Sequence, residues 1–275
     1  MITEIRKTLR ERSPLIHCIT NPISINQCAN VILSTGARPM MAEHPEEAAV
    51  MTACAGAVML NMGNITDVRK QSMLISAQTA KQKGIPFVLD VCGSACLTTR
   101  RDYALHLIDT SLPSVIKGNY SEITALFDPL YSSSGVDADK SLSEKDAANT
   151  ALQLAARYDT VVLASGKTDI ITDGKRLALV DNGCIQLSTV TGTGCMQGAL
   201  CAAFLSAAAP LDAATAASAV FGICGELAQT DKGSGSFMVN LLDALSTLTD
   251  KQIKELSKIS ISDALQANTK KEQIQ

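Results

Sequence analysis

The sequence predicts an α/β protein built on a mainly parallel sheet. Short apolar or β-branched runs recur along the chain, and each is followed by a segment with the spacing of an amphipathic helix. Strands that alternate with helices in this way form crossover units, which make neighbouring strands parallel. The chain has 275 residues, of which 46% are hydrophobic and 19% charged, so it can bury a large core. Because one doubly wound sheet can use a chain of this length, we expect a single domain over residues 1–275.

The expected elements of the first two thirds alternate between strand and helix. Four apolar runs with polar ends are expected to form strands, at 57–61, 86–90, 114–119 and 160–166. Three segments between or after them are expected to form helices, at 68–83, 101–110 and 145–158. Residues 132–135, with three serines and a glycine, are expected to form a surface loop.

The rhythm changes after residue 166. Turn sequences at Asp173-Gly174 and Asn182-Gly183 predict an antiparallel meander at one edge of the sheet, with strands at 169–172, 177–180 and 185–190. From Cys195 the chain is rich in alanine and is expected to be helical to its end. Its strongest helical segments are 199–208, 211–230 and 237–245, and the polar tail 266–275 is expected to fray.

Charge and cysteine content limit the environment and the partners. The chain carries 24 basic and 27 acidic residues, a formal charge of −3, so no basic field favours nucleic acid. The first twelve residues are charged and lack the apolar run of a signal peptide, and the odd number of nine cysteines favours reduced thiols in a cytoplasm. The longest apolar stretch, 199–209, is shorter than the roughly 20 residues that cross a bilayer. Cys92 and Cys96 have no further ligands at zinc-like spacing, so we expect no metal there.

Polar residues end the expected strands. Asp90 ends the second strand, Asn119 with Glu122 follows the third, and Ser165 ends the fourth. The carboxyl ends of parallel strands meet at one edge of a sheet, where ligands bind in open α/β folds. Two carboxylates and an amide at that edge suit Mg²⁺ beside substrate phosphates. The alternative is that Asp90 and Glu122 are helix caps or surface acids.

The segment VTGTGC at residues 190–195 ends the meander and opens a helix. Gly192 and Gly194 allow a sharp turn, so that consecutive N–H groups and the positive helix end face one point. This arrangement predicts an anion cradle, and the alternative is a tight turn without a ligand. Two other phosphate motifs are excluded, because Val161 replaces the first glycine of a Walker A loop and Gln197 replaces the third glycine of a dinucleotide loop.

Cys195 lies in the first turn of this helix, where the helix dipole is expected to lower the pKa of the thiol. A cysteine hydrolase would also need a histidine base. The chain offers His17, His44 and His106, and none has a sequence context typical of a catalytic base. His106 lies in an apolar helical run and is expected to be structural.

Taken in order, several segments resemble the hydroxyethylthiazole kinase family of the ribokinase-like superfamily. The resemblance runs from about Ser13 to Asp243. It is carried by SPLIHCITNPIS and NQCAN (13–24, 26–30), GARPMM with EE (36–41, 46–47), VLD (88–90), IKGNYSEI (116–123), VTGTGC (190–195) and GSGSF (233–237).

The resemblance implies a single ribokinase-like domain without a lid, assembled as a homotrimer with thiazole pockets between subunits. It implies ATP-dependent phosphorylation of 5-(2-hydroxyethyl)-4-methylthiazole, with Mg²⁺ as cofactor, in thiamine salvage. By position, it implies the following roles: thiazole contacts at Asn21, Met41 and Gly192, ATP contacts at Lys117, Asn119 and Ser165, and magnesium ligands at Asp90 and Glu122.

The same resemblance implies that the catalytic loop contains Gly192, Gly194 and Cys195. Cys195 stands where most ribokinase-like enzymes have a catalytic aspartate, so base catalysis is expected to be weak or unnecessary in a reaction that depends on positioning and charge neutralisation.

Several positions depart from the family pattern. Val91 and Cys92 replace Pro and Val, Ser94-Ala95 replaces Ala-Gly, Lys117 replaces Arg, Ser165 replaces Thr and Ser234 replaces Pro. Lysine keeps the charge of arginine but not its bidentate fork, so a weaker grip on ATP is expected. Two other functions remain open: a kinase of another small heterocyclic alcohol, such as a hydroxymethylpyrimidine or pyridoxal, and a thiazole or nucleotide binder without catalysis.

Overall fold

The computed structural model describes residues 1–133 and 142–263. Its centre is one nine-stranded sheet in the order β2-β1-β3-β4-β5-β6-β7-β8-β9. The strands from β2 to β6 are parallel, and the pairs from β6 to β9 are antiparallel. The strand bounds are β1 Leu15–Ile19, β2 Arg38–Met40, β3 Ala57–Asn61, β4 Phe87–Asp90, β5 Val115–Asn119, β6 Val161–Ser165, β7 Asp169–Thr172, β8 Arg176–Val180 and β9 Ile259–Asp263.

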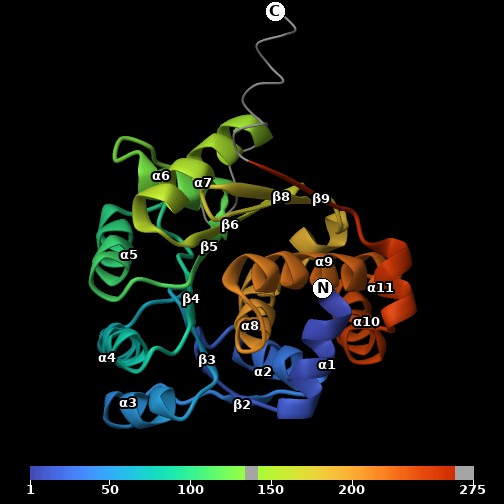
Figure 1. Cartoon of the computed structure of the whole chain (residues 1–275), viewed down its shortest axis with the longest axis horizontal. Helices are drawn as coiled ribbons and strands as arrows, with labels where there is room; N and C mark the ends of the chain where they lie inside the picture. The colour runs from blue at the N-terminus through green and yellow to red at the C-terminus, as the bar shows by residue number, and fades with distance from the viewer. Residues whose placement is uncertain (134–141, 264–275) are drawn as a thin grey trace, which may run out of the picture.

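Helices cover both faces of the sheet (Figure 1). One face carries α3 Pro45–Ala53, α4 Asp67–Lys83, α5 Thr98–Ser111, α6 Tyr120–Phe127 and α7 Glu144–Tyr158. The other face carries α1 Ile2–Arg12, α2 Ile25–Ser34, α8 Thr193–Leu205, α9 Pro210–Ala228, α10 Ser234–Thr247 and α11 Asp250–Leu256, with the short 3₁₀ helix η1 Ile185–Thr189. All nine strands of the described residues belong to this sheet, so these residues contain no second sheet that forms a lid.

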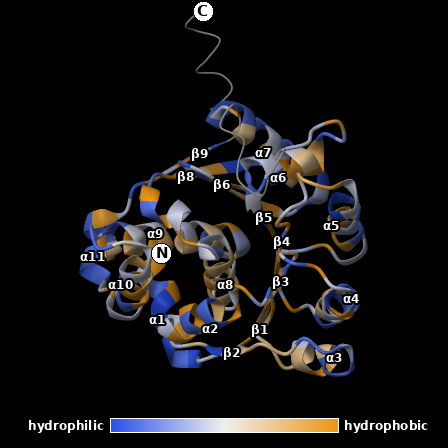
Figure 2. Cartoon of the chain, turned by 180° about the vertical axis from the view of Figure 1, so that it is seen from behind, coloured by the Kyte–Doolittle hydropathy of each residue, from blue (hydrophilic) through white to orange (hydrophobic). Residues whose placement is uncertain are grey.

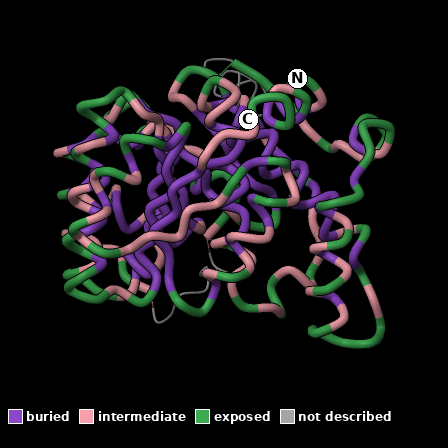
Figure 3. Tube along the Cα trace, turned by 90° about the horizontal axis from the view of Figure 1, so that it is seen from below, coloured by how far each residue is buried: buried purple, intermediate pink, exposed green. Residues whose placement is uncertain are grey.

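The sheet separates two hydrophobic clusters. Every residue of β3 is buried, as expected for a parallel strand with helices on both sides. Figure 2 shows hydrophobic strands in the middle of the molecule with helices on both sides, and Figure 3 shows that the interior is buried. The α9 helix is long and apolar enough to cross a membrane by length and composition, but 83% of its apolar window is buried inside the protein. It is a core helix that packs against α8 and α10.

Most expected elements are confirmed to within a few residues, but two predictions are wrong. Residues 185–190 form no strand, because none of the side chains in η1 is buried, and Gln186 is held by hydrogen bonds to both backbone groups of Thr230. The chain is also not helical to its end, since β9 pairs with β8. The alternating sequence ISISD was a strand signal that the alanine-rich region before it concealed.

The patterns considered above predict no helix or strand before residue 57. The structure places β1 and β2 there, with β2 at the edge of the sheet. The expected loop at 132–135 lies partly outside the described residues, and the expected fraying of 266–275 lies wholly outside them.

Candidate active site

The strand ends do meet at one edge of the sheet. The register pairs Asn61 with Asp90, Asp90 with Lys117, and Asn119 with Ser165. These residues lie in neighbouring parallel strands, so the sequence prediction that polar groups gather at the carboxyl ends of the strands is confirmed for β4, β5 and β6.

A buried ion pair lies at the centre of this edge. The Nζ atom of Lys117 donates to Asp90 Oδ2 at 3.0 Å and to the carbonyl oxygen of Gly194 at 2.9 Å. Only 4% of Lys117 and 1% of Asp90 are exposed. Burial alone would lower the pKa of Lys117, but the nearby acidic groups, of which Asp90 acts most strongly, together with the hydrogen bond to Asp90 outweigh it, and the pKa is raised. Lys117 therefore stays cationic and ties β4, β5 and the start of α8 together.

Glu122 forms a capping box with Asn119 at the start of α6. Its Oε2 accepts the N–H of Asn119 at 2.8 Å, and Asn119 Oδ1 accepts the N–H of Glu122 at 2.9 Å. Its Oε1 accepts the N–H of Gly93 at 2.7 Å. Burial, and then the charge of Asp90, raises the pKa of Glu122 to about 7, although the two N–H groups act in the opposite direction. Glu122 is thus the third residue of a helix whose N-cap is Asn119, and its side chain also holds the loop after β4.

The glycine loop has the geometry expected of an anion cradle. Gly192 is the N-cap of α8 with φ of 89°, and a Cβ atom there would lie 3.1 Å from Ser24 Cβ. The N–H of Met196 is the one that bonds to the carbonyl of Gly192. An α-helix leaves the N–H groups before that point without intrahelical acceptors. Those of Thr193, Gly194 and Cys195 are therefore available at the positive end of the helix dipole.

Cys195 is surrounded by asparagine side chains. Asn21 Nδ2 lies 3.3 Å and Asn61 Nδ2 3.4 Å from its sulfur. The expectation that the helix dipole lowers the pKa of this thiol is wrong, because burial and then the charge of Asp90 raise it. Cys195 is therefore a thiol at neutral pH.

The cysteine hydrolase alternative finds no base beside this thiol. His17 is buried, with its ring nitrogens 2.9 Å from Thr52 Oγ1 and 2.8 Å from the carbonyl oxygen of Ala42. His44 forms the capping box of α3. His106 is exposed on α5.

The remaining predicted residues lie around this centre. Met41 follows β2 directly and packs, half-buried, against the core on the α8 side of the sheet. Ser165 ends β6, and its hydroxyl donates to the carbonyl of Gly118 at 3.3 Å. The described residues contain no group of three or more His, Cys, Asp or Glu side chains arranged to hold a metal, including Cys92 and Cys96.

Sequence reasoning missed Asn61 as a site residue. It ends β3, is fully buried and contacts Cys195 directly. The signal was available, because Asn61 is the polar last residue of an apolar run, like Asp90 and Asn119.

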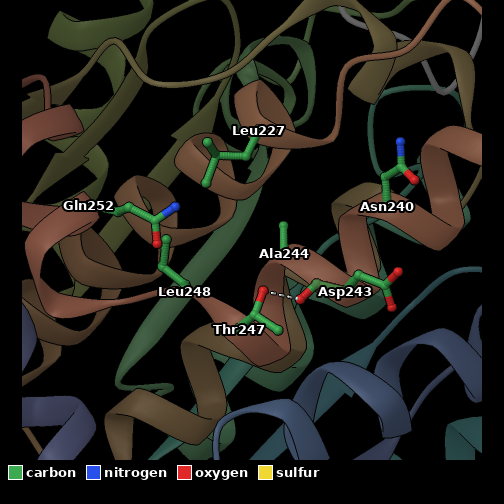
Figure 4. Close-up of a pocket in the computed structure, with 7 residues that line it drawn as sticks. All are labelled: Leu227, Asn240, Asp243, Ala244, Thr247, Leu248 and Gln252. Atoms are coloured by element: carbon green, nitrogen blue, oxygen red, sulfur yellow. Dashed lines mark hydrogen bonds between the residues drawn. The ribbon is translucent and has the colours of Figure 1, made fainter.

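Two surface hollows lie away from these groups. One of about 290 Å³ lies between α9, α10 and α11 (Figure 4) and is lined by Leu227, Asn240, Asp243, Ala244, Thr247, Leu248 and Gln252. A second, of about 260 Å³, is lined by residues of 80–87 and 111–114, before β4 and β5. Neither contains a residue of the cluster at the strand ends, which is the candidate active site because charged and polar groups converge there.

A solved structure shows the class of this fold. The pyridoxal kinase of Staphylococcus aureus, solved with AMP-PCP and pyridoxal, superimposes with a TM-score of 0.65 over 91% of this chain and 98% of that chain, at 13% sequence identity. At that identity the likeness concerns the fold alone. The chain has the ribokinase-like fold predicted above, and its helix-end anion loop beside buried charges is typical of a small-molecule kinase.

Closer relatives identify the family. The sequence model of the hydroxyethylthiazole kinase family matches residues 6–251. Hydroxyethylthiazole kinase 2 of Clostridium botulinum strain Hall is 43% identical over 264 residues, covering 94% of this chain and 99% of its own. The hydroxyethylthiazole kinase protein of Pyrococcus horikoshii OT3 superimposes with a TM-score of 0.88 at 35% identity, over 95% of this chain and 98% of that chain. The chain belongs to the hydroxyethylthiazole kinase family.

Proposed function

We propose that this kinase transfers the γ-phosphoryl group of ATP to the hydroxyl of 5-(2-hydroxyethyl)-4-methylthiazole, in thiamine salvage. The observation that carries the proposal is the position of the α8 anion loop directly beside the Lys117–Asp90 pair, in a chain of this family. Phosphoryl transfer has a loose transition state and depends mostly on positioning and on neutralising charge. The free N–H groups after Gly192 and the Lys117 ammonium supply both.

The proposed residue roles follow the geometry of the strand ends. Gly192, Gly194 and Cys195 form the catalytic loop that receives the transferred phosphoryl group. Lys117, Asn119 and Ser165 lie on adjacent β5 and β6, where they support an ATP site. Asn21, Met41 and Gly192 are proposed to contact the thiazole. Lys117 already uses two N–H groups internally, which supports a role in neutralising charge more than a flexible grip on ATP.

The acidic residues fit a magnesium ion that is bound mostly through phosphate and water. Lys117 pairs with Asp90, so the cluster of Asp90, Lys117 and Glu122 supplies about one net carboxylate when Glu122 is ionised. Each Glu122 oxygen accepts one N–H and keeps a further lone pair. Mg²⁺ typically uses one or two carboxylates and keeps its waters. Asp90 and Glu122 would therefore hold the ion, which when bound neutralises charge on the transferred group.

A homotrimer is the proposed assembly. Three large apolar side chains are exposed on one part of the surface. They are Val239 on α10, Ile185 on η1 and Ile23 just before α2. The α10 helix contacts both α2 and η1. The hydroxyl of Thr193 donates to the carbonyl of Leu187 and so joins η1 to the glycine loop, and a neighbouring subunit on this surface would exclude water from the site. We expect a trimer by sedimentation at assay concentration, and an active monomer would contradict this assignment.

The remaining proposals concern the domain and the compartment. The single continuous sheet supports one kinase domain over residues 1–275. The nine free cysteines, four of them fully buried, support the reducing environment of a cytoplasm.

The deciding experiment is an ADP-release assay with ATP, Mg²⁺ and three alcohols: the thiazole alcohol, hydroxymethylpyrimidine and pyridoxal. We expect fast turnover only with the thiazole alcohol. An equal or greater kcat/KM with hydroxymethylpyrimidine or pyridoxal would favour the alternative kinase. Binding of ATP and thiazole without ADP release would identify a non-catalytic binder.

A further inference from the structure

The side-chain amide of Asn61 has only one orientation that satisfies its neighbours. Its Oδ1 lies 2.9 Å from the backbone nitrogen of Gly63 and 3.0 Å from Asn21 Nδ2. A backbone N–H can only donate, so the atom that faces Gly63 must be the oxygen. The NH₂ group of Asn61 therefore faces the sulfur of Cys195, at 3.4 Å.

The amide of Asn21 is fixed by the same reasoning. Its Oδ1 accepts the backbone N–H of Ser24 at 3.2 Å, which leaves the NH₂ group to face Asn61 Oδ1 and the Cys195 sulfur. Asn21 and Asn61 are both buried. Two N–H donors with fixed orientation thus converge on one sulfur atom.

This convergence limits what the thiol of Cys195 can do. A neutral thiol has one S–H donor and a weakly accepting sulfur. The charged groups around it are Asp90 and Lys117, the thiol of Cys28 is also near, and the hydroxyl of Ser24 forms a hydrogen bond with this sulfur. Because the sulfur accepts from two amides, it has little capacity left to accept the proton of an alcohol. The hydrogen-bonding group that this thiol can still offer to a ligand is its S–H donor.

We propose that Asn61 is a positioning residue of the reaction, which together with Asn21 holds Cys195 as an acceptor toward the amides and so turns its S–H toward the bound substrate. Cys195 then serves the reaction as a hydrogen-bond donor at the start of the α8 anion loop, and not as a base. This inference rests on the proposed function only for the identity of the substrate.

The test changes one donor group of Asn61. Asn61→Asp keeps the oxygen that accepts from Gly63 and Asn21 but replaces the NH₂ that faces the sulfur. We expect kcat to fall about tenfold with little change in KM, and this fall should disappear in a Cys195→Ala background because the interaction partner is gone. An equal fall in both backgrounds would show that Asn61 is merely structural and would overturn the proposal.

A second readout needs no substrate. The rate at which iodoacetamide alkylates Cys195 at a fixed pH, followed by peptide mass, should fall in Asn61→Asp, because a thiolate loses an N–H donor and gains a negative neighbour. An unchanged rate would overturn the proposal. If the wild type turns over none of the three alcohols, the proposed function fails, while this measurement still decides the hydrogen-bond geometry.

Two further variants guard against misfolding. Asn240→Asp makes the same chemical change on α10, where the amide donates to the carbonyl of Ala228, and should leave both readouts unchanged.

Should Asn61→Asp fail to fold, Cys195→Ser supplies the decision, since a hydroxyl also accepts and donates. We expect it to exceed Cys195→Ala in kcat by about fivefold or more. Equal kcat values in the two variants would overturn the proposal.

Discussion

The parallel strands β1–β6 and the antiparallel strands β7–β9 belong to one sheet but place their charged groups differently. In the parallel part, Lys117 and Asp90 form an ion pair that is almost completely buried. In the antiparallel part, the pair Arg176–Asp173 lies in an exposed turn, and Lys258, paired with Glu226, is half-exposed. Surface pairs contribute little to stability, whereas a buried pair is costly to break.

The difference follows from the connections. A crossover returns the chain to the same edge, so every parallel strand ends where the others end. A hairpin reverses the chain at each turn, so successive strand ends alternate between edges. The parallel part therefore concentrates polar groups at one edge under the start of α8, and the antiparallel part uses its charged groups to close turns.

The largest expected effect is the loss of the buried carboxylate. Asp90→Asn should lower kcat by about three orders of magnitude, because charge neutralisation in the active site is lost. It should also cost about 3–5 kcal/mol in the free energy of unfolding, since Lys117 is left without its partner. Asp90→Asn combined with Lys117→Met should recover stability in urea denaturation but not ADP release.

The matched change in the antiparallel part is Asp173→Asn. It should leave kcat unchanged and cost no more than about 1 kcal/mol. Full activity of the combined Asp90 and Lys117 variant would show that the buried pair is structural only.

Two carboxylates are expected to respond to pH with opposite sign. Folding raises the pKa of Glu122 from 4.5 to about 7, so its stabilising contribution is complete below about pH 4.5 and is lost as the pH rises through 7. The loss is on the order of 3 kcal/mol, and Glu122→Gln should remove this pH dependence. The pKa of Asp173 is lowered by hydrogen bonds from Arg176 and Lys175 that outweigh its partial burial, so its contribution is lost on acidification. Urea denaturation between about pH 3 and 8 measures both pH dependences of the free energy of unfolding. If the wild type and Glu122→Gln gave parallel curves of stability against pH, the prediction for Glu122 would be contradicted.

Alanine substitutions at two glycines with left-handed backbone distinguish an effect on kcat from an effect on stability. Gly192 has φ of 89° and Gly174 has φ of 82°, in the turn between β7 and β8. Alanine at either position should cost about 1–2 kcal/mol, since a Cβ atom disfavours this conformation. Only Gly192→Ala should also lower kcat, by roughly thirtyfold, because it displaces the N–H groups of the anion loop. A similar loss of kcat in both variants would mean that stability alone limits the assay.

The smallest expected effects are at Cys195. Cys195→Ala should be slower but active, because the loop N–H groups and Lys117 remain. Cys195→Asp should be at least as active as Cys195→Ala, since a carboxylate accepts from both asparagines and still has lone pairs for the substrate proton. The gain should be within about tenfold and accompanied by a higher KM for ATP, because negative charge is added near the phosphates. An inactive Cys195→Asp variant that folds and binds ATP would refute this description of the site.

Much of the fold was predictable from local patterns. Buried strands are continuous apolar runs, and the bounds of the parallel strand β3 and of the antiparallel strand β7 were predicted to the residue. The strand predicted at residues 185–190 was wrong, because an apolar, β-branched run forms a strand only when a partner strand is available to bury it. In the structure β8 pairs with β9, from the far end of the chain, and no local pattern records that pairing.

The active site divides in the same way. The sequence by itself determined which residues end the strands and where glycines open α8, because these depend on backbone preferences over a few residues. Only the tertiary structure decided that Lys117 is bound by Asp90, 27 positions away, and that Asn61 faces Cys195, 134 positions away. Those contacts, and the raised pKa of the Cys195 thiol, arise from burial and from the close approach of distant segments, which periodicity and spacing along the chain do not contain.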